Sequence, residues 1–234
     1  MKRILISVAL FAVILLGETG CVQNNSAQDS SAQNINNVAL EYMEQKYGEK
    51  FEYVAPWGNS LSGTHELIVS CTSLPGYEIV VQVENYKQAD KVFRDNYLAV
   101  KYQQETTEFL QRHAEEVFGQ AIVLYEPSKD SQSESLSATA AYQEYLADTR
   151  TAIMPSIVVK RSCFTDKEQA LQLARLISGS GVRYLMSLMV ISDADYESGN
   201  WSSLGEFLAN KYETFTATIG NSNSEIEISW IEAE

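Results

Sequence analysis

The order of apolar and polar residues along the chain predicts a set of helices and a set of strands. Apolar residues that recur every three or four positions indicate amphipathic helices. The helices expected on this basis cover residues 38–47, 97–118, 138–149, 165–177 and 204–210. Alternating or continuous runs of β-branched and aromatic residues indicate strands. The strands expected on this basis cover residues 51–55, 66–72, 77–84, 121–125, 152–160, 182–192, 212–219 and 225–231.

Turn-forming residues show how some of these strands are connected. Pro75 and Gly76 stand between strands 66–72 and 77–84, and proline followed by glycine suits a type II turn. A segment rich in glycine and asparagine, residues 220–223, separates the last two strands in the same way. We therefore expect two hairpins, and hence antiparallel pairing.

Residues at the ends of elements give further expectations. Thr165 and Glu168 have the spacing of a capping box, in which the threonine accepts a backbone hydrogen bond and the glutamate reaches back. Pro155 cannot donate to a ladder, so strand 152–160 is expected to lie at an edge or to contain a bulge. The run 182–192 is apolar almost throughout, which indicates a strand at the centre of its sheet.

These elements indicate an α+β fold, with helices packed on predominantly antiparallel sheet. Residues 37–234 are enough for one large domain or for two closely joined halves. The polar stretch 128–137 is either a loop inside one domain or a linker between the halves 37–127 and 138–234. We favour the loop, because loops of this length occur within single domains.

The start of the chain has the layout of a secretory signal peptide. Lys2 and Arg3 precede an apolar run over residues 4–16, and Gly20 and Cys21 follow it. The run is too short to span a bilayer, which requires ~20 apolar residues. The Gly-Cys pair resembles the end of the lipobox of bacterial lipoproteins, in which the cysteine acquires a diacylglyceryl group and becomes the N-terminus after cleavage.

This resemblance implies a signal peptide over residues 1–20 and a lipid anchor on Cys21. Glu18 stands where the lipobox usually has an aliphatic residue, so simple secretion and an uncleaved membrane anchor are the alternatives. Residues 21–36 are mostly polar and lack apolar periodicity, which predicts a flexible tether with a reach of ~20 Å. We therefore expect a protein that is attached by lipid to the cell membrane and faces outside.

Three segments in the first half of the domain have a recognisable pattern. They are KYGEKFEY at 46–53, PWG at 56–58 and DNYLAVKY at 95–102. Together they resemble a family of small exported lipoproteins of Gram-positive bacteria that has no assigned activity, and the resemblance extends over residues 40–118. It implies kinship but no chemistry, because the shared residues are helix ends, turn formers and aromatic packing groups.

Composition and charge narrow the classes of partner. Apolar residues make up 45% of the chain and aromatic residues 10%, which is typical of a globular protein. The formal net charge of −14 repels nucleic acid and anionic lipid headgroups, so neither is an expected partner. This charge serves solubility or, alternatively, attracts cations or a basic partner.

Few residues are candidates for chemistry or for metal binding. His113 falls on the apolar stripe of the expected helix, and His65 has no metal-ligand spacing around it, so we interpret both as packing residues. Asp193, Asp195 and Glu197 alternate as calcium ligands do, but the glycine and the bidentate glutamate of an EF-hand are missing. We interpret this stretch as a solvated turn and expect no metal and no cofactor.

Cys71 and Cys163 are the two cysteines besides the candidate lipid site. They could form a disulfide in an exported protein, but each lies in or next to an apolar run, where a free cysteine packs as a small hydrophobe. We therefore expect free thiols.

No nucleophile elbow, zinc-protease, P-loop or dinucleotide motif is present in the sequence. We therefore expect no catalytic residues, and the leading interpretation is a non-enzymatic, lipid-anchored binding or accessory protein with an unknown ligand. The alternative is a cell-envelope hydrolase that uses acidic residues, since the chain has 31 Asp and Glu. A buried carboxylate pair in a cleft would favour the hydrolase, and exposed aromatic surface would favour the binding protein.

Overall fold

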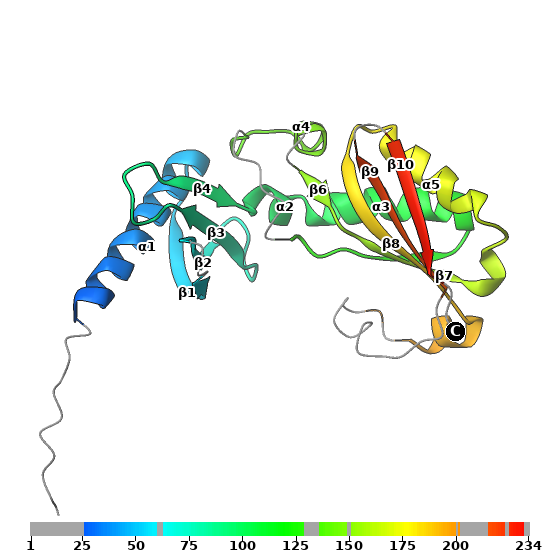
Figure 1. Cartoon of the computed structure of the whole chain (residues 1–234). Helices are drawn as coiled ribbons and strands as arrows, with labels where there is room; N and C mark the ends of the chain where they lie inside the picture. The colour runs from blue at the N-terminus through cyan, green and yellow to red at the C-terminus, as the bar shows by residue number, and fades with distance from the viewer. Residues whose placement is uncertain are drawn as a thin grey trace, which may run out of the picture.

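The computed structural model describes residues 26–59, 63–128, 136–148, 151–199, 201, 215–222 and 225–231. Two β-sheets form two lobes that lie side by side along the chain (Figure 1). The first lobe contains a four-stranded sheet and the second a six-stranded sheet, called here the smaller and the larger sheet. Buried apolar residues of both lobes belong to one contiguous core, so the lobes are joined by packing as well as by the chain.

The first lobe consists of a long helix and the smaller sheet. Its elements are α1 (Ser26–Tyr47), β1 (Phe51–Asn59), β2 (His65–Cys71), β3 (Ile79–Glu84) and β4 (Val92–Asp95). All neighbouring strands in the order β1-β2-β3-β4 are antiparallel. The C-terminal half of α1 packs through Ala39 and Met43, which are fully buried, while its N-terminal end projects away from the sheet (Figure 1).

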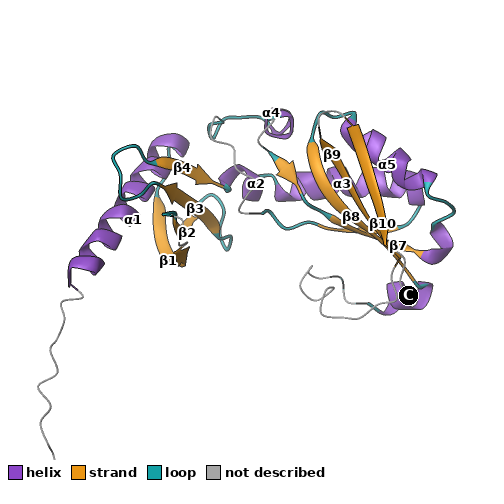
Figure 2. Cartoon of the chain, viewed as in Figure 1, coloured by secondary structure: helices purple, strands orange, loops and turns teal. Residues whose placement is uncertain are grey.

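The second lobe places two helices on one face of the larger sheet (Figure 2). Its elements are α2 (Tyr97–Lys101), α3 (Gln103–Phe118), β5 (Ala121–Leu124), α4 (Tyr142–Ala147), β6 (Ala152–Ile153), β7 (Ser156–Lys160), the 3-10 turn η1 (Arg161–Cys163), α5 (Glu168–Ser178), β8 (Arg183–Ile191), α6 (Asp193–Ser198), β9 (Phe215–Ser222) and β10 (Glu225–Ile231). The strand order is β10-β9-β8-β7-β5, with β6 also paired to β8. Only the pairs β7–β8 and β6–β8 are parallel among the described strands.

This arrangement is an α+β fold with helices on predominantly antiparallel sheet, so the expected fold class is confirmed. The hairpin between β2 and β3 is also confirmed: the Tyr77 N–H donates to the Leu74 carbonyl over 3.3 Å, and Gly76 has φ 84°, as a type II turn requires. Strand β8 lies at the centre of the larger sheet, as its apolar sequence predicts. The closing hairpin is formed by β9 and β10.

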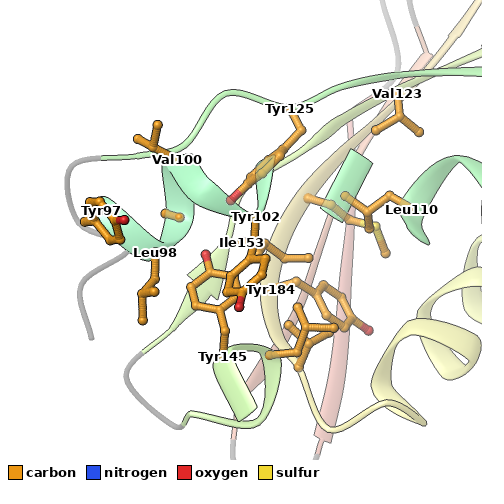
Figure 3. Packing of buried hydrophobic residues seen from close by; sticks show 14 of the residues in the cluster. Tyr97, Leu98, Val100, Tyr102, Leu110, Val123, Tyr125, Tyr145, Ile153 and Tyr184 are labelled. Atoms are coloured by element: carbon orange, nitrogen blue, oxygen red, sulfur yellow. The ribbon is translucent and has the colours of Figure 1, made fainter. Parts of the chain in front are cut away.

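Tyrosine side chains fill the junction of the two lobes (Figure 3). Tyr102 stands between α2 and α3 and donates its hydroxyl hydrogen to the Ala140 carbonyl. Tyr145 of α4 is fully buried, and Tyr125, directly after β5, is 5% exposed. The hydroxyl groups of Tyr125 and Tyr145 point toward one another in Figure 3. The junction is therefore a packed core with polar groups inside it.

The first helix is longer than the sequence pattern indicates. It begins at Ser26, so the expected tether over residues 21–36 is wrong for residues 26–36. Ile35 and Asn36 are 5% and 7% exposed, which places the packed part of α1 upstream of the expected start at Val38. A helix propagates readily from a segment that packing has already fixed, and this explains a helix in a polar sequence.

Other expected elements also differ at their boundaries. Strand β1 continues to Asn59, beyond its expected end at residue 55. Tyr102 leaves helical geometry, with φ −103° and ψ 18°, and divides the expected helix 97–118 into α2 and α3. Pro155 separates β6 from β7, so the irregularity expected there is a break in the strand. The helix expected over 138–149 is reduced to α4. The helix expected over 204–210 lies outside the described residues.

The expected capping box at Thr165 and Glu168 is wrong by one position. Asp166 Oδ1 accepts from the N–H of Glu168 over 2.9 Å and from that of Gln169 over 3.3 Å. Gln169 Oε1 in turn accepts from the Thr165 N–H over 2.7 Å. An aspartate carboxylate is as good a cap as a threonine hydroxyl. The pair Asp166 and Gln169 therefore fits the capping-box spacing as well as the pair Thr165 and Glu168.

Candidate functional site

A buried polar network joins α1 to the junction of β4 and α2. Asp95, whose side chain is 1% exposed, lies 2.8 Å from the Lys46 ammonium nitrogen, which is 10% exposed. The Tyr47 hydroxyl donates to Asp95 Oδ1 over 2.6 Å, and the Tyr97 N–H donates to the same oxygen over 3.1 Å. Two segments with a recognisable sequence pattern, 46–53 and 95–102, therefore meet here.

A second carboxylate, Glu49, extends this network toward the surface. It accepts from the Tyr97 hydroxyl over 2.6 Å and from the Ser73 hydroxyl over 2.7 Å. Burial acts to raise the pKa of Glu49, but the hydrogen bonds from Tyr97 and Ser73 outweigh it and lower the pKa. Burial, and then the Glu49 carboxylate, raise the pKa of Tyr97 to about 12.

These groups are poorly suited to acid–base catalysis near neutral pH. A carboxylate with a lowered pKa is a weak base, and a tyrosine with a raised pKa keeps its proton. Burial and the neighbouring Asp95 likewise raise the pKa of Tyr47. We interpret the network as a structural brace that fixes α1 against the rest of the first lobe.

The two histidines lie apart and have separate polar partners: Asn36 for His65, and the Glu116 carboxylate, 3.6 Å from Nδ1, for His113. His65 is 7% exposed, its Nε2 is 2.8 Å from Asn36 Oδ1 of α1, and burial lowers its pKa. The His113 ring packs edge-on against Phe109 with 4.8 Å between the centroids. The two rings belong to different lobes, so they do not form a shared site.

The acidic stretch after β8 forms helix α6, so the interpretation as a turn is wrong. Ser192 caps this helix by accepting from the Asp195 N–H. Hydrogen bonds from Ser162, first from its side chain and then from its N–H over 3.0 Å, lower the pKa of Asp193. Glu197 forms an ion pair with Lys160. The carboxylates thus have separate partners. The part of the chain that the structure describes contains no group of three His, Cys, Asp or Glu side chains suited to a metal ion.

Both cysteines of the domain are free thiols, as expected. Cys71 is buried with its Sγ 3.4 Å from the Ser73 Oγ, and Cys163 is half-buried.

Reductant is therefore expected to leave the thermal midpoint nearly unchanged. A disulfide of this span would make reduction cost ~2–5 kcal/mol, which corresponds to roughly 5–15 °C in a domain of this size. The measurement compares melts with and without reductant and counts thiols after denaturation without reductant. Absence of free thiols at Cys71 and Cys163, together with a fall of that size, would contradict the structure.

The described residues cover only part of the face of the larger sheet opposite α3 and α5. Close to α6, the side chains of Tyr196 and Trp201 pack on the buried Met189 and Ile191. Farther along β8, Leu185 is 52% exposed. A pocket of about 320 Å³ lies there, lined by Ala152, Met154, Arg183, Tyr184, Leu185, Gly220, Asn221 and Glu227. An open apolar area with a polar rim is typical of an interaction site.

Strand β10 forms one edge of this open face. Its residues alternate between exposed and half-buried along the whole strand. Glu225, Glu227 and Ile231 are exposed, and Ile231 is 63% exposed. Ile226, Ile228 and Trp230 pack against the core instead. The sequence pattern predicted correctly which residues of β10 face the core. It did not indicate that the residues on the opposite face of β10 form part of an open surface.

Strand β1 also carries exposed apolar side chains. Tyr53, Val54 and Trp57 are 42%, 49% and 49% exposed. Exposed aromatic residues of this kind were the feature expected of a binding protein. Cys21, the one site residue that the sequence assigned, lies outside the described residues.

Comparisons with known proteins identify only a distant neighbour. No family model matches the chain, and no curated protein matches it. The chain is similar to the crystal structure of a DUF5037 family protein from Ruminococcus gnavus ATCC 29149, with 13% identity, a TM-score of 0.39, and coverage of 82% of this chain and 94% of that one. At that score the likeness carries no argument about fold or function. No helix within the described ranges is long and apolar enough to cross a membrane.

Proposed function

We propose that the protein is a lipid-anchored binding or accessory protein on the outer face of the cell membrane. The observation that carries the anchor is the apolar run over residues 4–16 followed by Gly20 and Cys21, which has the layout of an exported lipoprotein. Besides the membrane, the proposed partner is a protein or another envelope component that contacts the domain. Nucleic acid is disfavoured by the net charge of −14.

The described surface supports binding better than catalysis. The larger sheet offers an open face with a pocket that includes Leu185 and Glu227, and β1 exposes Trp57. The most deeply buried carboxylate, Asp95, is tied to Lys46. A hydrolase that uses acidic residues is the alternative, and no carboxylate pair among the described residues favours it.

Cys21→Ala is expected to abolish lipid labelling and to release the protein from the membrane fraction. The thioether needs the cysteine sulfur, and a single exported domain without its lipid has no other expected anchor. The measurement is metabolic labelling with a fatty acid followed by membrane fractionation. Cys163→Ala is the matched control, because it removes a half-buried thiol and leaves the anchor.

Two outcomes would contradict the lipid anchor. Equal labelling of the variant would place the lipid elsewhere. Membrane retention of the unlabelled variant with residues 1–16 still attached would show that the apolar run itself holds the chain.

A further inference from the structure

Among the described strands, β10 has the geometry of a regular sheet edge. Its pairing with β9 runs without a register shift from Glu225 opposite Ser222 to Ile231 opposite Thr216. It is the last of the described strands on that side of the larger sheet. An edge strand of this regularity presents a row of backbone donors and acceptors to which an extended segment can add.

The edge strand β1 of the smaller sheet is a useful contrast. Its register against β2 shifts between Tyr53 and Ala55 and again between Pro56 and Gly58. Bulges and proline are two devices that natural proteins use to prevent edge pairing, and charged side chains are a third. On β10 the charges are those of Glu225 and Glu227, which oppose acidic segments but not basic ones. Strand β10 contains neither a proline nor a bulge, so of these two edges it is the one suited to pair.

The side chains of β10 specify which residues a paired segment should carry. Glu225 and Glu227 are exposed on the open face, and Glu227 also lines the pocket beside Leu185. On the other face Ile226 and Ile228 are half-buried against the core. Cross-strand neighbours on the same face interact directly, and opposite charges stabilise while like charges destabilise.

We propose that β10 binds an extended peptide segment of a partner by strand addition, and that this segment alternates apolar with basic residues. The apolar side chains would cover Ile226 and Ile228, and the basic ones would lie beside Glu225 and Glu227. The net charge of −14 attracts such a segment and repels a second copy of the chain. The inference rests on the proposed binding function and specifies the class of ligand.

The test uses the full chain in detergent and a fluorescein-labelled peptide of alternating valine and lysine, long enough to match β10. Fluorescence anisotropy is expected to show saturable binding, and hydrogen exchange is expected to slow in residues 225–231. A peptide of alternating valine and glutamate should not bind. The double variant E225K/E227K should bind the valine–lysine peptide with about tenfold lower affinity, because two attractive cross-strand pairs become repulsive.

A matched variant distinguishes the effect of the charges on β10 from the effect of the net charge on the peptide affinity. E41K/E52K changes the net charge by the same amount at two exposed glutamates of the first lobe, and it should leave the affinity within about twofold at moderate ionic strength, where distant surface charges are screened. E225K/E227K should instead gain binding to the valine–glutamate peptide. Such a gain would show that the variant is folded.

Three results would overturn the proposal. The first is equal loss of affinity in both variants, and the second is slowed exchange confined to another segment. The third is slowed exchange of residues 225–231 without peptide together with a dimer in sedimentation, which would assign the edge to a second copy. None of these results bears on the lipid anchor, which the Cys21 variant tests separately.

Discussion

Asp95→Ala is expected to lower the free energy of unfolding by ~3–5 kcal/mol, the cost of removing one partner of a buried ion pair. The variant leaves the Lys46 ammonium, 10% exposed, without the carboxylate that lies 2.8 Å from it. It also removes the acceptor of the Tyr47 hydroxyl. Equilibrium unfolding in urea, monitored by circular dichroism, gives the difference.

Glu84→Ala is the control for this prediction. Glu84 forms an ion pair with Arg94 over 3.2 Å in which the side chains are 37% and 40% exposed, and pairs open to solvent contribute ~0–1 kcal/mol. A loss of under ~1 kcal/mol in Asp95→Ala would show that the network does not brace α1.

Raising the pH above ~10 is expected to unfold the protein in one cooperative step. Burial, followed by the proximity of Asp95, raises the pKa of Tyr47, and burial raises the pKa of Tyr125 to about 12. Burial and the proximity of Tyr125 raise the pKa of Tyr145. Below the unfolded pKa of ~10 these hydroxyls are protonated in both states, so their contribution to stability is fully present.

Above that pH the unfolded chain releases protons that the folded chain retains, so stability falls with a slope of ~1.4 kcal/mol per pH unit for each such tyrosine. Absorbance of tyrosinate should therefore rise in step with loss of near-ultraviolet dichroism. Tyr145→Phe should make the transition less steep, whereas Tyr77→Phe, at a residue 46% exposed, should not change it. Gradual ionisation of all tyrosines in a folded protein would contradict this expectation.

The sequence predicted the fold class because local signals were strong where hairpins and amphipathic helices occur. Pro75 and Gly76 gave the first hairpin, and the apolar run of β8 gave the centre of the larger sheet. The predicted ends of elements were wrong where tertiary packing determines them. Helix α1 starts at Ser26 because packing at Ile35 and Asn36 fixes its middle, and no apolar period signals that.

The candidate site was harder to predict than the fold. The sequence showed that Ile226, Ile228 and Trp230 share one face, and the structure confirms this. It could not show that β10 is an edge, because strand order arises from pairings between distant segments. Likewise, no local signal in the sequence pairs Asp95 with Lys46, because their contact joins segments that lie far apart in sequence.

The length of α1 has a mechanical consequence. A helix of 22 residues measures about 33 Å at 1.5 Å per residue, and it begins close to Cys21 in the sequence. Under the proposed lipid anchor, the part of α1 upstream of the buried Ile35, residues 26–34, is a lever of about 14 Å, and the Lys46–Asp95 pair helps to fix the rest of the helix to the first lobe. A pull on that lipid would then be transmitted along this helical segment as torque on the first lobe.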